Sequence, residues 1–424
     1  MSSSLAAGLS PVRETLANGA TVIVQETSAT PAVSINATFL AGSFYDPADL
    51  PGLAYLTARV IDRGTRVKDA DAIAEELDKR GVALRIGTTR HTMAFSSTCL
   101  AEDFDDVLDL VVDVARRPTF PEAELAKRRA ESITALRQDA DNPAVRAGEA
   151  LSELLYGSSH PYGRPAKGTV ATLERIERNA LIGFHANEIR PAVLTLVVVG
   201  DVRATRTINR ARELLEDWTG APERPIVVPP PAADSSRRIR EIAMPGKSQT
   251  DIAYGFTTIS RFDPRYHAYW ILNNILGQFG LGGRLADNIR ERQGMAYYTF
   301  SEFNANFGDS PLVVRAGVDP RNVDRTVEAI DAEVRDLGLN GPTAVEMDES
   351  RSYLIGSIPR LLETNNTIAT FLQDSERFDL GLDYDRRLPQ LLEAVTIDEV
   401  RAAAADVLHP ERAALAIAGP ETER

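Results

Sequence analysis

Arg290 and Tyr297 are the residues whose types and spacing first suggest chemistry. Residues 285–292 have the apolar spacing of a helix, Gly294 provides a left-handed C-terminal cap, and the aromatic, β-branched run after it predicts a strand. A guanidinium and a phenol, both strong hydrogen-bond donors, are therefore expected to converge at one sheet edge. Each also has a structural explanation, because the helix dipole favours a cation near a helix C-terminus and tyrosine is common in strands. Other features of the sequence are needed to distinguish a chemical role for the pair from a structural one.

Metal chemistry has little support in the histidine and cysteine content. A zinc hydrolase built on one helix needs two imidazoles at positions i and i+4 with a glutamate beside them. The nearest two of the five histidines are 25 positions apart, so no helical pair exists. Cys99 is the only cysteine, which excludes an internal disulfide and a cysteine-based zinc site and predicts a role in core packing. We expect no metal in this chain. The histidines, interpreted as surface or packing residues, are His91, His160, His185, His267 and His409.

Length and composition describe an ordinary globular protein of two or more domains, with 424 residues, 43% of them hydrophobic and 25% charged. The net charge of −14 and the lack of a basic block argue against nucleic acid and anionic membranes as partners. The first residues lack the features of a secretory signal, and no apolar run is long enough to span a bilayer. We expect a cytoplasmic protein, or a periplasmic one if the numbering is that of a processed form.

An internal duplication becomes visible when residues 173–200 are aligned with residues 392–419. The offset of 219 holds without a gap, and each block is predicted as a helix, a turn marked by proline and a buried strand. The proline-rich segment 219–236 between the copies cannot join a strand ladder and favours an extended spacer. The sequence therefore predicts an N-terminal domain of residues 1–218, a linker of residues 219–236 and a homologous C-terminal domain of residues 237–424.

The elements predicted in each copy are strand pairs followed by helices, without a regular alternation of strand and helix. In the first copy, strands are expected at residues 20–27, 32–42 and, as a hairpin, 82–100, and helices at 52–62, 69–80, 102–116 and 121–138. In the second copy, strands are expected at 237–244, 251–259, 296–307 and 310–318, and helices at 265–277, 322–337, 344–362 and 367–378. This order favours an α+β fold, with an antiparallel or mixed sheet covered by helices in each copy.

Several short sequence motifs occur at characteristic spacings in both copies. The first copy has Ala-Gly-Ser at 41–43, Gly-Leu-Ala at 52–54, Arg-Gly-Thr at 63–65 and His-Pro-Tyr-Gly at 160–163. In the second copy, a glycine loop with Gly280, Gly282 and Gly283 precedes Arg290 and Tyr297. On these motifs the whole chain resembles the pitrilysin and mitochondrial-processing-peptidase family of zinc peptidases, the inverzincins. A phosphate cradle is the other interpretation of the glycine loop, but no Gly-Lys-Ser/Thr follows it.

The zinc motif of that family is degenerate here. The family carries His-x-x-Glu-His on a helix of the first copy. In this chain, Tyr55 and Arg59 occupy the two histidine positions and Ala58 occupies the glutamate position. The family's third ligand is a glutamate further along, and in the matching region 128–138 only Glu131 lies nearby. A positive charge at Arg59 also opposes a divalent cation. The resemblance therefore implies a metal-free first half.

For the second half, the resemblance implies a role in peptide hydrolysis. In the family, one half brings zinc and another brings the arginine and tyrosine, either within one long chain or from two subunits. This chain resembles the second kind of subunit, the non-catalytic, zinc-free member of a heterodimeric metalloendopeptidase that is inactive alone. Arg290 and Tyr297 would bind substrate and stabilise negative charge on the scissile carbonyl oxygen, and Gly282 and Gly283 would line the substrate-binding loop. Zinc, the attacking water and the glutamate base would belong to the zinc-bearing partner subunit.

A catalytically inactive scaffold, or a peptide-binding or chaperone subunit of the same fold, is the alternative from another class. Such a protein would keep the fold but would have no reason to keep Arg290 and Tyr297, so the pair favours the peptidase subunit. An independent hydrolase finds no support, because the chain has no Gly-x-Ser-x-Gly signature.

Overall fold

Two compact units make up the computed structural model, which describes residues 8–223, 225–232, 236–278 and 282–421. The first unit comprises Met1–Leu136, Pro165–Pro225 and Ile358–Arg387, and the second comprises Arg137–Arg164, Ile226–Ser357 and Leu388–Arg424. Each unit holds one sheet covered by helices. The α+β class expected from the sequence is therefore confirmed.

The sheet of the first unit has the strand order β1-β2-β6-β3-β5-β4. β2 and β6 run parallel, and the other neighbours run antiparallel. Successive residues of β6 point to opposite faces, so Leu196 and Val198 join one hydrophobic core while Val197 and Val199 join another. The strands are β1 (Val12–Thr15), β2 (Thr21–Glu26), β3 (Ala32–Phe39), β4 (Arg85–Thr88), β5 (Met93–Leu100) and β6 (Leu194–Gly200).

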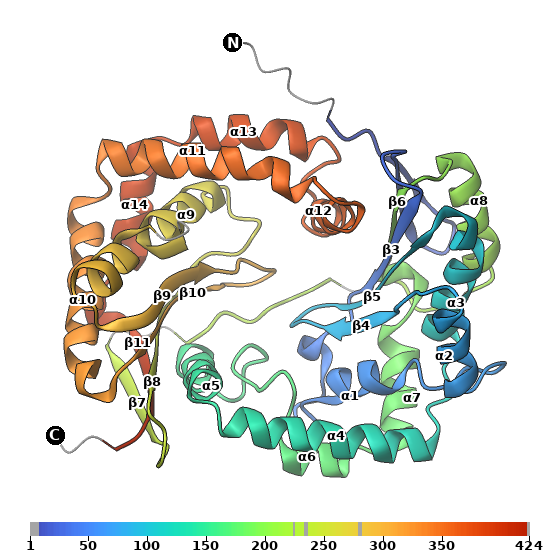
Figure 1. Cartoon of the computed structure of the whole chain (residues 1–424), viewed down its shortest axis with the longest axis horizontal. Coiled ribbons are helices and arrows are strands. Elements are labelled where there is room, and N and C mark those ends of the chain that lie inside the picture. The colour runs from blue at the N-terminus through green and yellow to red at the C-terminus, as the bar shows by residue number, and fades with distance from the viewer. Residues whose placement is uncertain (1–7, 224, 233–235, 279–281, 422–424) are drawn as a thin grey trace. The chain divides into compact units, whose positions relative to one another are not determined.

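Helices of the first unit cover both faces of this sheet. α3 (Phe104–Arg116) packs on β3 and β5, and α8 (Ala204–Leu215) packs on β2. α12 (Asn365–Arg377) lies along β3 and β6 on the other face, where Leu372 meets Val197 and Val199 (Figure 1). The remaining helices are α1 (Leu53–Val60), α2 (Ala70–Asp78), α4 (Glu122–Ala140), which continues into the second unit, α6 (Val170–Arg175) and α7 (Arg178–Glu188).

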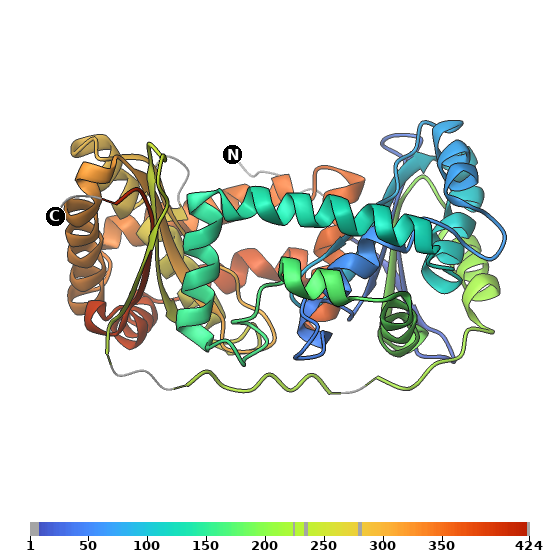
Figure 2. The same ribbon diagram turned by 90° about the horizontal axis from the view of Figure 1, so that it is seen from below.

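The sheet of the second unit repeats this topology, with the strand order β7-β11-β8-β10-β9 and one parallel pair, β7 with β11. α5 (Pro143–Tyr156) lies along β8 and β11 (Figures 1 and 2). The strands are β7 (Arg238–Ala243), β8 (Thr250–Thr257), β9 (Ala296–Phe303), β10 (Pro311–Val318) and β11 (Ala414–Gly419). The other helices are α9 (Tyr266–Asn273), α10 (Val323–Asn340) and α14 (Ile397–Val407), together with the π-helical segments η4 (Asn274–Gln278) and η5 (Ala286–Arg292). α11 (Ala344–Leu361) ends in the first unit and α13 (Tyr384–Ala394) begins there, so the unit boundary passes through both helices.

The two units exchange one helix each relative to the order of the chain. α5 precedes the segment 219–236 but belongs to the second unit, and α12 follows it but belongs to the first. The compact units therefore differ from the residue ranges 1–218 and 237–424. No helix or strand forms in the described part of 219–236, which agrees with an extended spacer.

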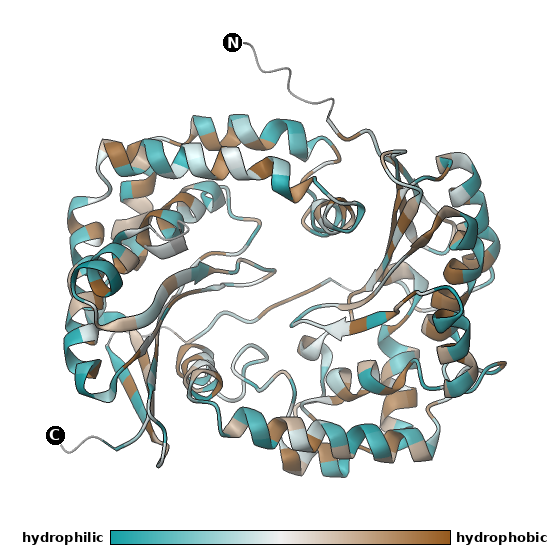
Figure 3. Cartoon of the chain, in the orientation of Figure 1, coloured by the Kyte–Doolittle hydropathy of each residue, from teal (hydrophilic) through white to brown (hydrophobic). Residues whose placement is uncertain are grey.

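Hydropathy follows this architecture. Hydrophobic residues gather on the strands and on one side of the covering helices, and hydrophilic residues gather on the other side (Figure 3). None of the helices in the described residues has both the length and the apolar character that crossing a bilayer requires. Cys99 is buried in the first core, as expected.

Candidate functional site

The turn between η5 and β9 positions Arg290 and Tyr297. The structure shows a π-helical segment where a helix was expected over residues 285–292, and the Gln293 amide donates to the Asn288 carbonyl. Gly294 has a φ of +61°, so it forms the left-handed cap that the sequence predicts. Its amide donates to the carbonyl oxygen of Arg290 at 3.1 Å. The residue that starts the turn toward Tyr297 is thus bonded to Arg290 itself.

Tyr297 is the extra residue of a β-bulge in an edge strand. β9 ends the sheet, and its register with β10 shifts between Tyr298, which pairs with Gly317, and Ala296, which pairs with Val318. Tyr297 is left between them with a side chain that is 68% exposed and has no hydrogen-bond partner among the described residues. Bulges often re-aim a side chain beside an active site. The phenol of Tyr297 is therefore presented to solvent and free to donate.

The guanidinium of Arg290 is held weakly. Its side chain is 27% exposed and pairs with the adjacent Glu291, with Nε 2.8 Å and Nη2 2.7 Å from Oε1. The carboxylate of Glu291 is largely exposed, and exposed ion pairs contribute little to stability because water competes for both charges. Arg290 can therefore exchange Glu291 for a carbonyl group of a ligand at small energetic cost. Among the described residues no hydrogen bond joins Arg290 to Tyr297, and the two are connected through the turn at Gly294.

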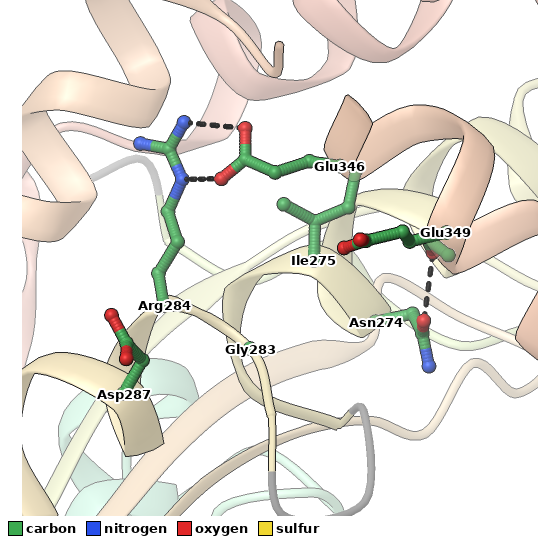
Figure 4. A pocket seen from close by; sticks show the side chains of 8 residues that line it. Asn274, Ile275, Gly283, Arg284, Asp287, Glu346 and Glu349 are labelled. Carbon is green, nitrogen blue, oxygen red and sulfur yellow. Dashed lines mark hydrogen bonds and ion pairs between the residues drawn. The ribbon is translucent and has the colours of Figure 1, made fainter. Parts of the chain in front are cut away.

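At the end of the glycine loop, Gly283 is closely packed and the side chain of Arg284 is held by two carboxylates. Gly283 has a φ of +85°, and a Cβ atom there would lie 3.0 Å from the Cα of Gly277. Arg284 binds Glu346 through Nε at 2.6 Å (Figure 4). Its Nη1 atom lies 2.6 Å from Oδ2 of Asp336. Gly282 is half-buried, and Gly280 lies outside the described residues. A pocket of about 220 Å³ adjoins the loop, lined by Asn274, Ile275, Gly283, Arg284, Asp287, Glu346, Glu349 and Ser350.

The degenerate zinc-motif positions lie on α1 and do not fit a metal. Tyr55 is half-buried, Ala58 is buried with only a methyl group to offer, and Arg59 is a cation. The Nη2 atom of Arg59 lies 3.3 Å from Oε2 of Glu131, the carboxylate nearest to the expected third ligand. A hydrogen bond from Arg128, helped by the charge of Arg59, lowers the pKa of Glu131. Within the described residues, no group of three or more histidine, cysteine, aspartate or glutamate side chains could hold a metal ion. We derive no zinc chemistry from these residues.

Comparison with models of known protein families shows to which family this chain belongs. A model described as insulinase, peptidase family M16, matches residues 21–164, and one described as peptidase M16 inactive domain matches residues 175–354. The chain belongs to peptidase family M16. The resemblance inferred from the motifs is confirmed, and the half that carries Arg290 matches the domain described as inactive.

Known relatives of this M16 chain match most of its length. A protein named an uncharacterized zinc protease from Streptomyces coelicolor is 26% identical over 97% of this chain and 90% of that protein. A protein named a non-peptidase homolog from Helicobacter pylori is 23% identical over 89% of this chain and 87% of that protein. A crystal structure described as a peptidase M16 inactive domain from Pseudomonas fluorescens superposes with a TM-score of 0.91 at 26% identity, covering 98% of both chains. The names of these relatives include both proteases and a non-peptidase.

Proposed function

We propose that this chain is the zinc-free subunit of a heterodimeric zinc endopeptidase that hydrolyses peptides. The observation that carries the proposal is that Tyr297 is presented, exposed and unpartnered, on a bulge that follows Arg290, while the zinc-motif positions hold Tyr55, Ala58 and Arg59. The donors for the reaction would come from this chain, and the metal would be bound by a zinc-motif-bearing M16 partner.

The chemistry of the pair follows from charge that develops during hydrolysis. Attack on the scissile peptide bond places negative charge on its carbonyl oxygen, and a donor aimed at that oxygen contributes about 3 kcal/mol to lowering the barrier. Arg290 would leave Glu291 and bind a substrate carbonyl, and Tyr297 would donate its phenolic hydrogen bond as charge develops. When bound in the partner, zinc would activate the attacking water. Neither residue of the pair has to give up a proton.

The test is a peptide-cleavage assay on this chain alone, on its zinc-motif partner alone, and on the mixture with and without a chelator. A protein of family M16 that carries the zinc motif and comes from the same organism is the first partner to try. Activity confined to the mixture and abolished by the chelator is the expected result. If the partner alone cleaves the peptide as fast as the mixture does, this chain supplies nothing to the reaction and the proposal fails.

Replacing Arg290 with alanine should separate turnover from assembly. In the active mixture, Arg290→Ala should lower kcat/KM by about 100-fold, because the donor acts on developing charge. Subunit association, measured by size-exclusion chromatography, should change little. Arg292→Ala is the matched control, because Arg292 lies on the same π-helical segment, is exposed and forms an ion pair with Asp287. Equal activities for the two variants would remove Arg290 from the reaction.

A scaffold or peptide-binding subunit without catalysis is the second candidate. It is favoured by the name of the Helicobacter pylori relative, a non-peptidase homolog. In that case the two M16 chains would associate while the mixture cleaved no peptide. The assay described above therefore distinguishes the two candidates directly.

A further inference from the structure

Asn288 lies at the centre of a short hydrogen-bond chain that begins at the end of η5 and ends on α10. Its side-chain Oδ1 accepts from Nε2 of Gln293 at 2.8 Å, and its Nδ2 donates to Oε1 of Glu333 at 2.6 Å. Its backbone carbonyl oxygen also accepts from the amide of Gln293 at 3.1 Å. Asn288 is thus bonded twice to Gln293 and once to a separate helix.

The backbone bond from Gln293 to Asn288 closes the turn that contains Arg290. This bond reaches back five residues, one more than in an α-helix, so the turn is π-helical. Such turns are rare and are found frequently at functional sites. Arg290 lies inside the loop that the bond closes, between residues 288 and 293. Contacts that fix this turn therefore also fix the direction in which Arg290 leaves the helix.

Glu333 anchors the other end of the chain. It is half-buried within α10, which packs against α14 and η5. Burial raises the pKa of Glu333, and the hydrogen bond from Asn288 acts in the opposite direction, as do the charges of Arg284 and Arg292. A partly buried carboxylate needs donors, because loss of one is costly away from water. The turn is therefore tied to a packed helix by a bond that favours its own retention.

The two bonds of the Asn288 side chain require an amide. An ionised carboxylate only accepts hydrogen bonds, so the nitrogen of Asn288 must face Glu333 and its oxygen is left for Gln293. We infer that Asn288 is a positioning residue for the proposed peptidase reaction, because it holds the turn that directs Arg290 toward the substrate. This inference rests on the proposed function, and Asn288 acts through Arg290 and not on the substrate itself.

Replacing Asn288 with aspartate tests this role, because the shape is kept while a second carboxylate faces Glu333. In the active mixture, Asn288→Asp should lower kcat by about tenfold or more with little change in KM, since a displaced donor loses transition-state stabilisation. Adding Glu333→Gln exchanges donor and acceptor across the pair and should restore most of kcat. Asn340→Asp is the matched control, because Asn340 donates to a carboxylate at 2.7 Å within α10 and takes no part in the turn. Its kcat should stay near that of the wild type.

Hydrogen exchange on the chain alone follows the turn without any partner. Exchange of residues 289–295 should accelerate in Asn288→Asp and return toward the wild-type rate when Glu333→Gln is added. A purely structural role would lower the unfolding temperature of Asn288→Asp and leave kcat intact. Wild-type kcat, unchanged exchange, or no recovery in the double variant overturns this inference without affecting the proposed function. A wild-type mixture that cleaves no peptide overturns the proposed function and this inference with it.

Discussion

A single extra residue in β9 determines how Tyr297 is presented. Without the bulge, Tyr297 would continue the alternation of the strand, whereas the register shift leaves it 68% exposed. Its neighbour Tyr298 is instead hydrogen-bonded to Asp251, and burial, followed by that hydrogen bond, raises the pKa of Tyr298. Two adjacent tyrosines therefore have different roles, since one is anchored and the other is available to a ligand.

This difference leads to opposite predictions for the two phenols. In the proposed heterodimer, Tyr297→Phe should lower kcat/KM by about tenfold or more and leave thermal unfolding unchanged, because the lost hydroxyl has no hydrogen-bond partner within the described structure. Tyr298→Phe should lower the unfolding temperature and leave kcat/KM nearly unchanged, because it removes the bond to Asp251. Kinetics and thermal unfolding on both variants make the comparison. A Tyr297→Phe subunit with full activity would exclude the phenol from the reaction.

Residue chemistry also predicts how stability depends on pH. His91 is fully buried and stacked on Phe44, with ring centroids 4.8 Å apart. Burial, with the charges of Arg377 and Arg90, lowers the pKa of His91 to about 3. The unfolded chain binds a proton near pH 6.5 and the folded chain does not, so this contribution to stability is complete above pH 6.5 and is lost as the pH falls. The loss amounts to about 2 kcal/mol at pH 5. Urea unfolding at pH 7 and pH 5 should show a smaller difference for His91→Gln than for the wild type.

At the candidate site, the sequence predicted the order of helix, turn and strand but not the π-helical hydrogen bonds or the β-bulge. Gly294 correctly indicated the left-handed turn, and its position in the sequence puts Arg290 before the turn and Tyr297 after it. The π-helical hydrogen bonds and the bulge depend on how η5 packs and how β9 registers with β10, and these are tertiary effects. The pairing of Arg59 with Glu131 depends equally on the contact of two helices far apart in sequence.

At the scale of elements, the turn at Gly294 is the feature that a small change can probe. A Cβ atom at this position would meet nothing within 4 Å, so Gly294→Ala adds only the strain of a left-handed backbone. The variant should be destabilised by about 1 kcal/mol and should also lower heterodimer activity. Gly356→Ala, in the helix α11 and equally open, should instead stabilise the chain by up to about 1 kcal/mol. Denaturant unfolding of both variants should give changes of opposite sign, and a stabilised Gly294→Ala would contradict the role of the turn.

Among the elements that were not predicted from the sequence are β1, α5, α8 and α13. β1 is short and largely exposed, so its residues lack the apolar alternation of a strand. α5 did leave signals: Asn142 caps its start, Pro143 occupies its first turn, and Gly157 follows its end with a φ of +81°. The other long elements carried strong apolar periodicity, and the structure confirms them within a few residues.

At the scale of the whole molecule, duplication explains why the exchange of helices is invisible in the sequence. α5 shifted by the offset of 219 overlaps α12, so the two helices are equivalent elements of the two copies. The two sheets repeat one topology, and an apolar helix face that fits one sheet also fits the other. Apolar periodicity therefore predicts that each helix packs on a sheet without saying on which one. The segment 219–236 separates the copies along the chain, whereas the compact units are built across it.

The exchange predicts that damage to a helix weakens the sheet of the other copy. Leu372 of α12 packs against Val197 and Val199, and Leu151 of α5 lies over Gly255 of β8. Leu372→Ala should remove about 2 to 5 kcal/mol of local stability by leaving a cavity, and hydrogen exchange should then accelerate in β3 and β6. Leu151→Ala should accelerate exchange in β8 and β11. If Leu372→Ala instead exposed β8 and β11 while β3 and β6 stayed protected, each helix would belong to its own copy, and the division into exchanged units would be wrong.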